Sequence, residues 1–252
     1  MEINKRAIRA WSMMGQTGQF GVIMNQLAES NEDFCIVTAD LCQFSGLERF
    51  SSGILGATHM ALEDVAIMRA LPDITIISPA DCTETAKCLE ALTEYNKPVY
   101  IRLTGGARAP IVYTDDYNFE IGRAVSVKKG EDVCILASGS MVYTSLKAAE
   151  ELDDLGISTS VIDVHTIRPL DKNITDIMIS HKLIVTVEEH SIVGGLGDAV
   201  VNLAMLEGLQ LPILKIGVEG SYPHAAAYTT LLERAGLTKE EIVKKIKDRV
   251  KN

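Results

Sequence analysis

The chain has 252 residues, of which 47% are hydrophobic and 23% charged, a balance typical of one large or two ordinary folded domains and not of a disordered chain. Its 24 basic and 34 acidic residues give a formal net charge of −10, which argues against a protein that binds the phosphate backbone of nucleic acids. The apolar runs are strand-sized and far short of the ~20 residues of a bilayer crossing, and the first residues lack the apolar core of a signal peptide, so we expect no contact with a membrane.

In the first half, apolar patterns predict helices over 5–13 and 20–29, a strand over 34–38, a helix over 59–71 that Pro72 stops, and a strand over 74–78. Asp81, with Glu84 three residues later, predicts the start of another helix. A strand over 99–103 completes this half. Three strands in about a hundred residues are few for an independent domain with a parallel sheet.

The stretch 104–118 carries Gly105-Gly106, Pro110 and Asp115-Asp116 and has no sustained apolar period, so we interpret it as a linker between domains 1–103 and 119–252. The second half alternates between strands and helices. Strands are predicted over 133–137, 160–164, 183–187 and 213–216, with helices between them and a last helix that begins with the capping box Thr238 and Glu241. The fold class is therefore α/β, with two domains and mainly parallel sheets.

The cysteine pattern bears on the cellular compartment. The chain has five cysteines and no C-x-x-C pair, at Cys35, Cys42, Cys82, Cys88 and Cys134. An odd count without paired spacing is typical of free thiols in a reducing compartment. We therefore expect a cytoplasmic protein without structural zinc.

Three places carry residues suited to chemistry. Asp40 follows the strand over 34–38, where ligands collect in open α/β sheets, although a turn or cap aspartate has the same pattern. His59 opens a predicted helix, where it would be a neutral hydrogen-bonding group or a buried packing residue. The run 188–190, Glu-Glu-His, lies before Gly194-Gly195-Leu196-Gly197. This pattern suits an anion or metal site, but we favour a structural turn that contacts another domain or subunit.

The order of these motifs resembles the transketolase family over nearly the whole chain. The pyrimidine-binding domain is indicated by Thr-Ala-Asp-Leu at 38–41, by the Thr-His motif and its helix over 58–72, and by Ser-Pro-Ala-Asp at 78–81. The C-terminal domain is indicated by Glu-Glu-His at 188–190 and by the glycine run at 194–197. The pattern looks most like the C-terminal subunit of a split transketolase, and the same two domains occur in deoxyxylulose-phosphate synthase and in β subunits of 2-oxo-acid dehydrogenases.

The resemblance implies thiamine diphosphate chemistry, in which the thiazolium carbanion transfers a two-carbon ketol unit from a ketose to an aldose. It places Asp40 and Leu41 near the cofactor, His59 at the reacting oxygens of the sugar substrate, and Ser45 at the substrate's phosphate. It also implies that a separate N-terminal subunit holds the diphosphate and its magnesium, so that this chain has no metal ligand. The resemblance further implies that this chain forms a homodimer.

The sequence departs from the family pattern between Phe50 and the Thr-His motif. The segment that carries the glutamate that activates the cofactor is absent, so no residue can be assigned that catalytic role. Either residues of the real polypeptide are missing from this sequence close to Phe50 and Ser51, or the chain has a true deletion. We favour the first explanation, because a sheet without its central strands would expose apolar faces and unpaired edges.

Smaller differences concern the substrate. Leu55 replaces an aspartate that recognises the sugar, and Gly105 replaces an arginine that binds phosphate. Arg102 matches a position that more often points into the structure, and Arg108 could restore the charge only if the linker folds back. An acceptor other than the usual pentose and tetrose phosphates is therefore open. The alternative functions are those of a 2-oxo-acid dehydrogenase β subunit and of a noncatalytic interaction subunit.

Overall fold

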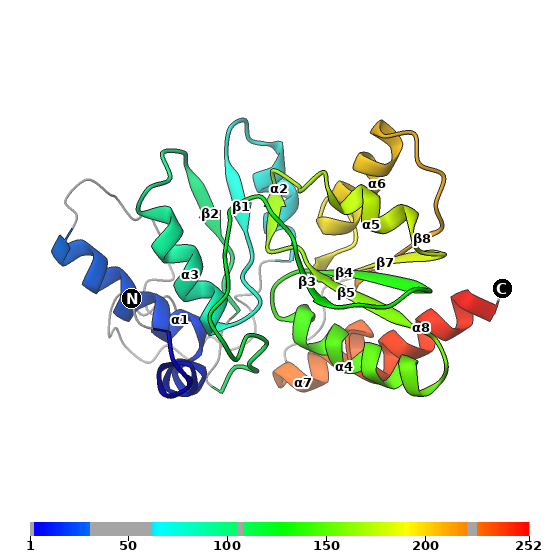
Figure 1. The fold of residues 1–252 in the computed structure, drawn as a ribbon, viewed down its shortest axis with the longest axis horizontal. Coiled ribbons are helices and arrows are strands. Elements are labelled where there is room, and N and C mark those ends of the chain that lie inside the picture. Colours follow the sequence, from blue (N-terminus) through cyan, green and yellow to red (C-terminus); the bar gives the residue numbers. More distant parts are fainter. Residues whose placement is uncertain (1–2, 31–61, 105–107, 221–225, 252) are drawn as a thin grey trace.

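The structure is a computed structural model that describes residues 3–30, 62–104, 108–220 and 226–251. These residues form two sheets with helices packed around them, arranged side by side along the long axis of the molecule (Figure 1). The predicted α/β class and the mainly parallel pairing are confirmed. The predicted strand over 34–38 lies outside the described residues.

The helices of the first half follow the sequence pattern with one shift. Helix α1 (Lys5–Ser30) is broken at Gly15, whose φ of 76° only glycine adopts without strain, so the two predicted helices meet at this kink. Helix α2 (Asp64–Ala70) starts later than the predicted 59–71, because the described residues Leu62 and Glu63 are not helical. It ends where expected, since Leu71 before the proline is extended, at φ −76° and ψ 137°.

The smaller sheet joins the two halves of the chain. Strand β1 (Thr75–Ile77) pairs in parallel with β2 (Val99–Ile101) and antiparallel with β6 (Thr166–Arg168), which comes from the second half. Sequence analysis missed β6, because Thr-Ile-Arg is not an apolar run of the kind that marked β1 and β2. Helix α3 (Cys82–Leu92) packs against α1 beside this sheet (Figure 1).

The larger sheet has the strand order β3-β5-β4-β7-β8. Its strands are β3 (Val125–Lys128), β4 (Val133–Ala137), β5 (Thr159–Asp163), β7 (Leu183–Ser191) and β8 (Ile213–Val218). Only β3, an edge strand that the sequence did not predict, runs antiparallel within the described sheet. The other strands are parallel, and β4, β5 and β7 in the middle of the sheet are buried on both faces, which explains their continuous apolar runs.

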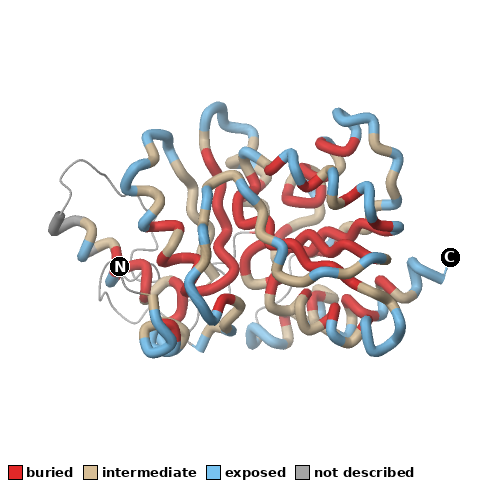
Figure 2. Tube along the Cα trace, in the orientation of Figure 1, coloured by how far each residue is buried: buried red, intermediate tan, exposed pale blue. Residues whose placement is uncertain are grey.

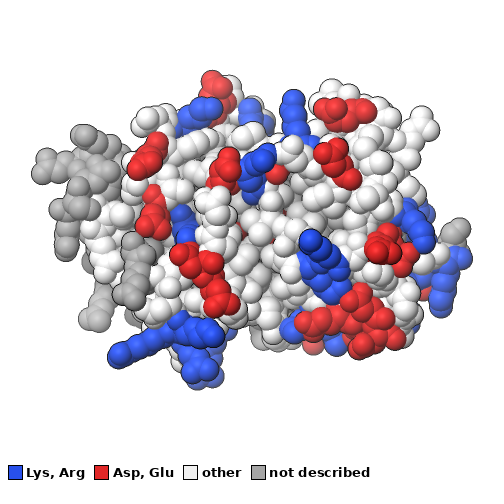
Figure 3. Space-filling view, viewed as in Figure 1, with Lys and Arg blue, Asp and Glu red and all other residues white. Residues whose placement is uncertain are grey.

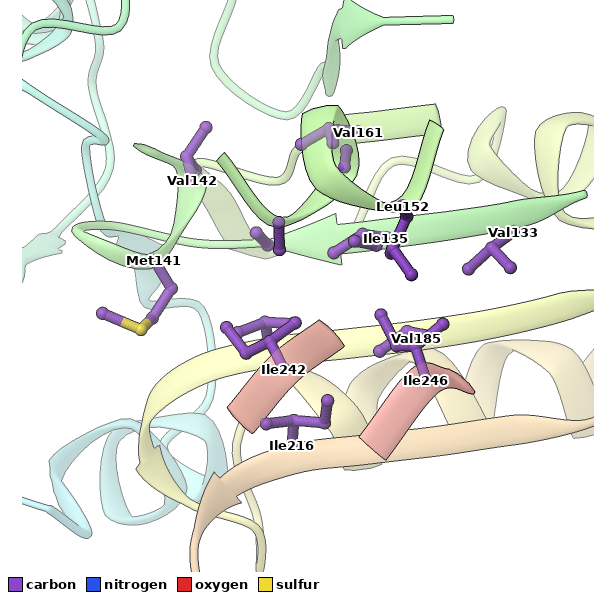
Figure 4. Packing of buried hydrophobic residues seen from close by; sticks show 14 of the residues in the cluster. Val133, Ile135, Met141, Val142, Leu152, Val161, Val185, Ile216, Ile242 and Ile246 are labelled. Carbon is purple, nitrogen blue, oxygen red and sulfur yellow. The ribbon is translucent and has the colours of Figure 1, made fainter. Parts of the chain in front are cut away.

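Helices cover both faces of this sheet (Figure 1). On one face lie α4 (Met141–Asp154), α7 (Tyr228–Ala235) and α8 (Lys239–Lys251), and on the other lie α5 (Ile174–Ile179) and α6 (Leu196–Leu206). Successive residues of a strand point to opposite faces of the sheet. Ile135 belongs to the core on the face covered by α4 and α8, and Leu136 to the core on the face covered by α5 and α6. Figure 4 shows the first contact, and Figure 2 shows that burial concentrates in these strands.

The predicted linker is a packed segment. Within its described part, 108–118, the chain has neither helix nor strand, yet Tyr113 is buried. The carboxylate of Asp81 accepts hydrogen bonds from the backbone N–H groups of Val112 and Tyr113 at 2.7 and 2.9 Å, and from that of Glu84 at 2.9 Å. Asp81 therefore caps α3, as predicted, and also holds this segment in place.

The surface carries both charge signs. Figure 3 shows acidic side chains gathered over α4 and basic side chains near the start of α1 on the face in view. None of the helices in the described ranges combines the length and the apolar character needed to cross a bilayer.

Candidate functional site

The residues to which the sequence assigned cofactor and substrate contacts, Asp40, Leu41, Ser45 and His59, all lie outside the described residues. The predicted gap at Phe50 and Ser51 and the position of Leu55 lie outside them too, and these assignments stay predictions. The described chain resumes at Leu62, three residues after His59 in sequence. The described residues that follow His59 in sequence form the junction where α2 meets the carboxyl ends of β2 and β7.

A partly buried ion pair joins α2 to β2 and β7. The carboxylate of Asp64 accepts hydrogen bonds from the Tyr100 hydroxyl at 2.8 Å and from Nε of Arg102 at 2.9 Å. The same guanidinium donates to the backbone carbonyl of Glu189 at 2.9 Å. The Arg102 side chain is 18% exposed, so it points into the structure, as the sequence comparison with the family suggested. The arginine is therefore a structural bridge between the halves in this arrangement.

The glycine run after β7 forms a closed cap. Glu188 is buried, and its two carboxylate oxygens accept the N–H groups of Leu196 at 2.7 Å and Gly197 at 2.8 Å, at the start of α6. Burial raises the pKa of Glu188 to about 7, against the opposing effect of these two donors. A Cβ on Gly195 would lie 2.0 Å from Oε2 of Glu188, which explains the glycine. The helix N-terminus thus holds the chain's own carboxylate in place of an external anion.

The same run contacts the first half of the chain. A Cβ on Gly194 would lie 2.4 Å from Cβ of Ala66 in α2, and Arg69 of α2 donates to the carbonyls of Gly194 and Gly195. The predicted contact between domains is therefore confirmed. The predicted turn lies at 192–195, and residues 188–190 are not part of it, because β7 continues to Ser191, which pairs with Val218 of β8.

His190 is a buried neutral ring. Its Nδ1 donates to the carbonyl of Ser191 at 2.7 Å, and its Nε2 accepts the N–H of Ala66 at 3.4 Å. Burial lowers the pKa of His190, which agrees with one donating and one accepting nitrogen. This histidine ties β7 to α2.

Sequence analysis missed a carboxylate contact at the same sheet edge. Oε2 of Glu189 accepts the hydroxyls of Ser140, at the start of α4, at 2.5 Å and of Tyr228, at the start of α7, at 2.7 Å. Burial, followed by the charge of Glu189, raises the pKa of Tyr228. No local pattern links three residues so far apart, and α7 itself was not predicted.

Hydrogen bonds within the chain occupy the carboxylates of α2 and β7 that an activating acid would have to come from. Three carboxylates at this junction are engaged: Asp64 by Arg102 and Tyr100, Glu188 by the α6 cap, and Glu189 by two hydroxyls. They therefore do not fit the activating role in thiamine diphosphate chemistry. The described ranges also contain no group of three or more His, Cys, Asp or Glu residues that could hold a metal ion.

Two family models match the chain in order. The transketolase pyrimidine-binding domain matches residues 47–107, and the transketolase C-terminal domain matches residues 122–242. A subunit of the apulose-4-phosphate transketolase of Actinobacillus succinogenes is 30% identical over 213 residues, which is 84% of this chain and 68% of that protein. The putative transketolase C-terminal section of Methanocaldococcus jannaschii is 38% identical over 198 residues, 78% of this chain and 62% of that protein.

Solved structures of transketolases also match the chain. A split-gene transketolase, described as an inactive beta4 tetramer, matches with a TM-score of 0.69 and 37% identity over 75% of this chain and 61% of that one. The transketolase of Campylobacter jejuni, with a TM-score of 0.60 and 20% identity over 77% of this chain and 29% of that one, shares the fold. The chain spans about three fifths of the length of the curated relatives it matches first.

Proposed function

The chain belongs to the transketolase family, and from that we propose that it is the C-terminal subunit of a two-component transketolase. Its reaction is the transfer of a two-carbon ketol unit from a ketose to an aldose. The observation that carries this proposal is the 37% identity to a split-gene transketolase over 75% of the chain. The names of the two relatives above, a C-terminal section and one subunit of a transketolase, support the same role.

The proposal includes a shared cofactor site. Thiamine diphosphate supplies the carbanion chemistry when bound, and a separate N-terminal subunit holds its diphosphate and magnesium. This chain contributes Asp40 and Leu41 near the cofactor and His59 and Ser45 toward the sugar, and it pairs with a second copy of itself. Cytoplasmic location fits the free thiols of Cys82, Cys88 and Cys134.

The functional polypeptide contains further residues near Phe50 and Ser51. Family members activate the cofactor with a glutamate from that segment, and neither the sequence nor the described junction offers a replacement. Intact mass spectrometry of the protein expressed from its own gene tests this point. A mass well above 27.4 kDa supports the proposal, whereas a mass of 27.4 kDa favours a noncatalytic interaction subunit.

Reconstitution tests the activity. The chain is combined with a transketolase N-terminal subunit, magnesium and thiamine diphosphate, and ketol transfer is followed with panels of ketose donors and aldose acceptors. We expect turnover only in the full mixture and a large loss in the His59→Ala variant. Turnover by this chain alone would refute the need for a partner.

Two other functions have distinct outcomes in the same experiment. A stable complex without turnover, formed by the protein expressed from its own gene, indicates a noncatalytic subunit. Turnover only with a 2-oxo acid and a lipoyl acceptor indicates a 2-oxo-acid dehydrogenase β subunit.

A further inference from the structure

A pair of buried carboxyl groups joins the two halves of the chain away from the α2 junction. Glu84 lies in the first turn of α3 and Asp163 at the end of β5, and both have 0% exposure. Each accepts a tyrosine hydroxyl from the packed segment 108–118: Tyr117 donates to Oε1 of Glu84 and Tyr113 to Oδ2 of Asp163, both at 2.7 Å. The two rings stack with centroids 4.2 Å apart. Three parts of the chain therefore meet at this pair.

The hydrogen bonds around the pair are incomplete unless one group holds a proton. Oδ1 of Asp163 is buried without a hydrogen-bond partner. Both oxygens of Glu84 accept, Oε1 from Tyr117 and Oε2 from the N–H of Ala80 at 2.7 Å. The side chains of Glu84 and Asp163 lie within hydrogen-bonding reach of each other. A proton on Glu84 would give Oδ1 of Asp163 the donor it lacks.

No positive charge among the described residues faces the pair. The titratable groups around it are Asp81 and Cys88 of α3 and the two tyrosines. Lys87 of α3 lies 5.9 Å from the ring centroid of Tyr117 and is paired with Asp116 at the surface. Two adjacent ionised carboxylates in such surroundings would repel each other without compensation.

We propose that Glu84 and Asp163 share a single proton at neutral pH and act as a latch between the two halves of the chain, with Glu84 as the acid and Asp163 as the carboxylate. The latch opens as pH rises and the shared proton leaves, because two facing negative charges then remain. Burial raises the pKa of both groups. Nothing in the proposed transketolase function requires this pair.

The direction of the pH effect follows from proton counting. An unfolded carboxyl group has a pKa of about 4.3, so above about pH 5 the unfolded chain holds no proton where the folded pair holds one. The folded state is therefore favoured at lower pH, and the advantage is lost as pH rises through the pKa of the pair. For each pH unit in this window, the unfolding constant of the unaltered protein rises about tenfold relative to a variant without the shared proton.

The test compares the full chain with Glu84→Gln, which keeps the shape of a protonated glutamate and its donor to Asp163. Urea unfolding between pH 5.5 and 8 should show the tenfold divergence per unit, and the exposed control Glu150→Gln should follow the unaltered protein. Parallel pH dependence of Glu84→Gln and the unaltered protein would overturn the proposal.

Infrared difference spectra give a second measurement that needs no comparison of stabilities. They are recorded in a Glu188→Gln background, because Glu188 also has a raised pKa. At neutral pH we expect a protonated-carboxyl band that Glu84→Gln removes. Tyr117→Phe, which removes the donor to Oε1 of Glu84, should shift this band and serves as the comparison if Glu84→Gln does not fold. Absence of the band in that background refutes the latch.

Discussion

Replacing Gly195 by alanine tests the closed cap at the start of α6. The backbone of Gly195 has a φ of −84°, which any residue adopts, so the effect is steric. The new Cβ would lie 2.0 Å from Oε2 of Glu188 and 2.7 Å from both Cδ of Glu188 and Nδ1 of His190. Both neighbours are buried, at 2% and 1% exposure, and are held by hydrogen bonds to Leu196, Gly197 and Ser191.

The size of the expected stability loss follows from the groups that the added methyl group displaces. Overpacking a buried site costs about 1–3 kcal/mol, and each buried donor left without a partner costs about 1–3 kcal/mol. If the carboxylate of Glu188 is pushed from the cap, the N–H groups of Leu196 and Gly197 lose their acceptors. We therefore expect a loss of at least about 3 kcal/mol, or roughly 6–12 °C in melting temperature for a chain of this size.

Urea unfolding of the purified chain is the assay, with Gly208→Ala as the matched control. Gly208 has a φ of 70°, and no atom lies within 4 Å of the place that an added Cβ would occupy, so its substitution introduces backbone strain alone, about 1–2 kcal/mol. Adding Glu188→Ala to Gly195→Ala should lose less stability than the two single changes summed, because the clash with the carboxylate is gone. A Gly195→Ala loss no larger than that of the control would refute the steric argument.

Three further predictions concern buried groups. Asp81→Ala should lower the free energy of unfolding by at least about 3 kcal/mol, because three backbone N–H donors lose their acceptor. A loss below ~1 kcal/mol in urea unfolding would show that water replaces the carboxylate. Burial raises the pKa of Glu188 to about 7, so the folded chain holds a proton that the unfolded chain has lost above ~pH 5. The free energy of unfolding of the unaltered protein, relative to that of Glu188→Gln, should therefore fall by about 1.4 kcal/mol per pH unit between ~pH 5 and 7 and then level off. A difference that does not depend on pH would contradict this pKa. Three thiols are buried, those of Cys82, Cys88 and Cys134, and burial raises the pKa of Cys82 to about 12. Peptide mapping after brief alkylation should therefore find them unmodified until urea unfolds the chain. Rapid labelling of the native protein would contradict their burial.

The elements that sequence analysis predicted well are those with long or strongly capped patterns. The buried strand over 133–137 and the helix that starts after Asp81 were found because continuous apolar runs and side-chain caps are local signals. Strand β6 and helix α7 were missed. Thr-Ile-Arg of β6 is not an apolar run, and its pairing with β1 depends on residues far apart in the sequence.

The site was predictable to a smaller degree. The contact between the glycine run and the first half was inferred correctly, and the position of 188–190 on a strand was not, because its pairing with β8 extends β7 beyond the apolar run. The engagement of Glu189 by Ser140 and Tyr228, and of Asp64 by Arg102, could not be found from spacing. The assignments of Asp40, Leu41, Ser45 and His59 remain predictions from family resemblance.

Strand β6 belongs to the second half of the chain but pairs with β1 of the first half, so the chain cannot be divided between the halves without breaking a sheet. Cutting it at 104–118 would strip β1 of its partner β6 and separate the two tyrosines from at least one of their acceptors. Each fragment would then present an open strand edge that invites intermolecular pairing. If the chain were divided at this point, in evolution or by engineering, the separate fragments would aggregate. They would fold only if they were produced together.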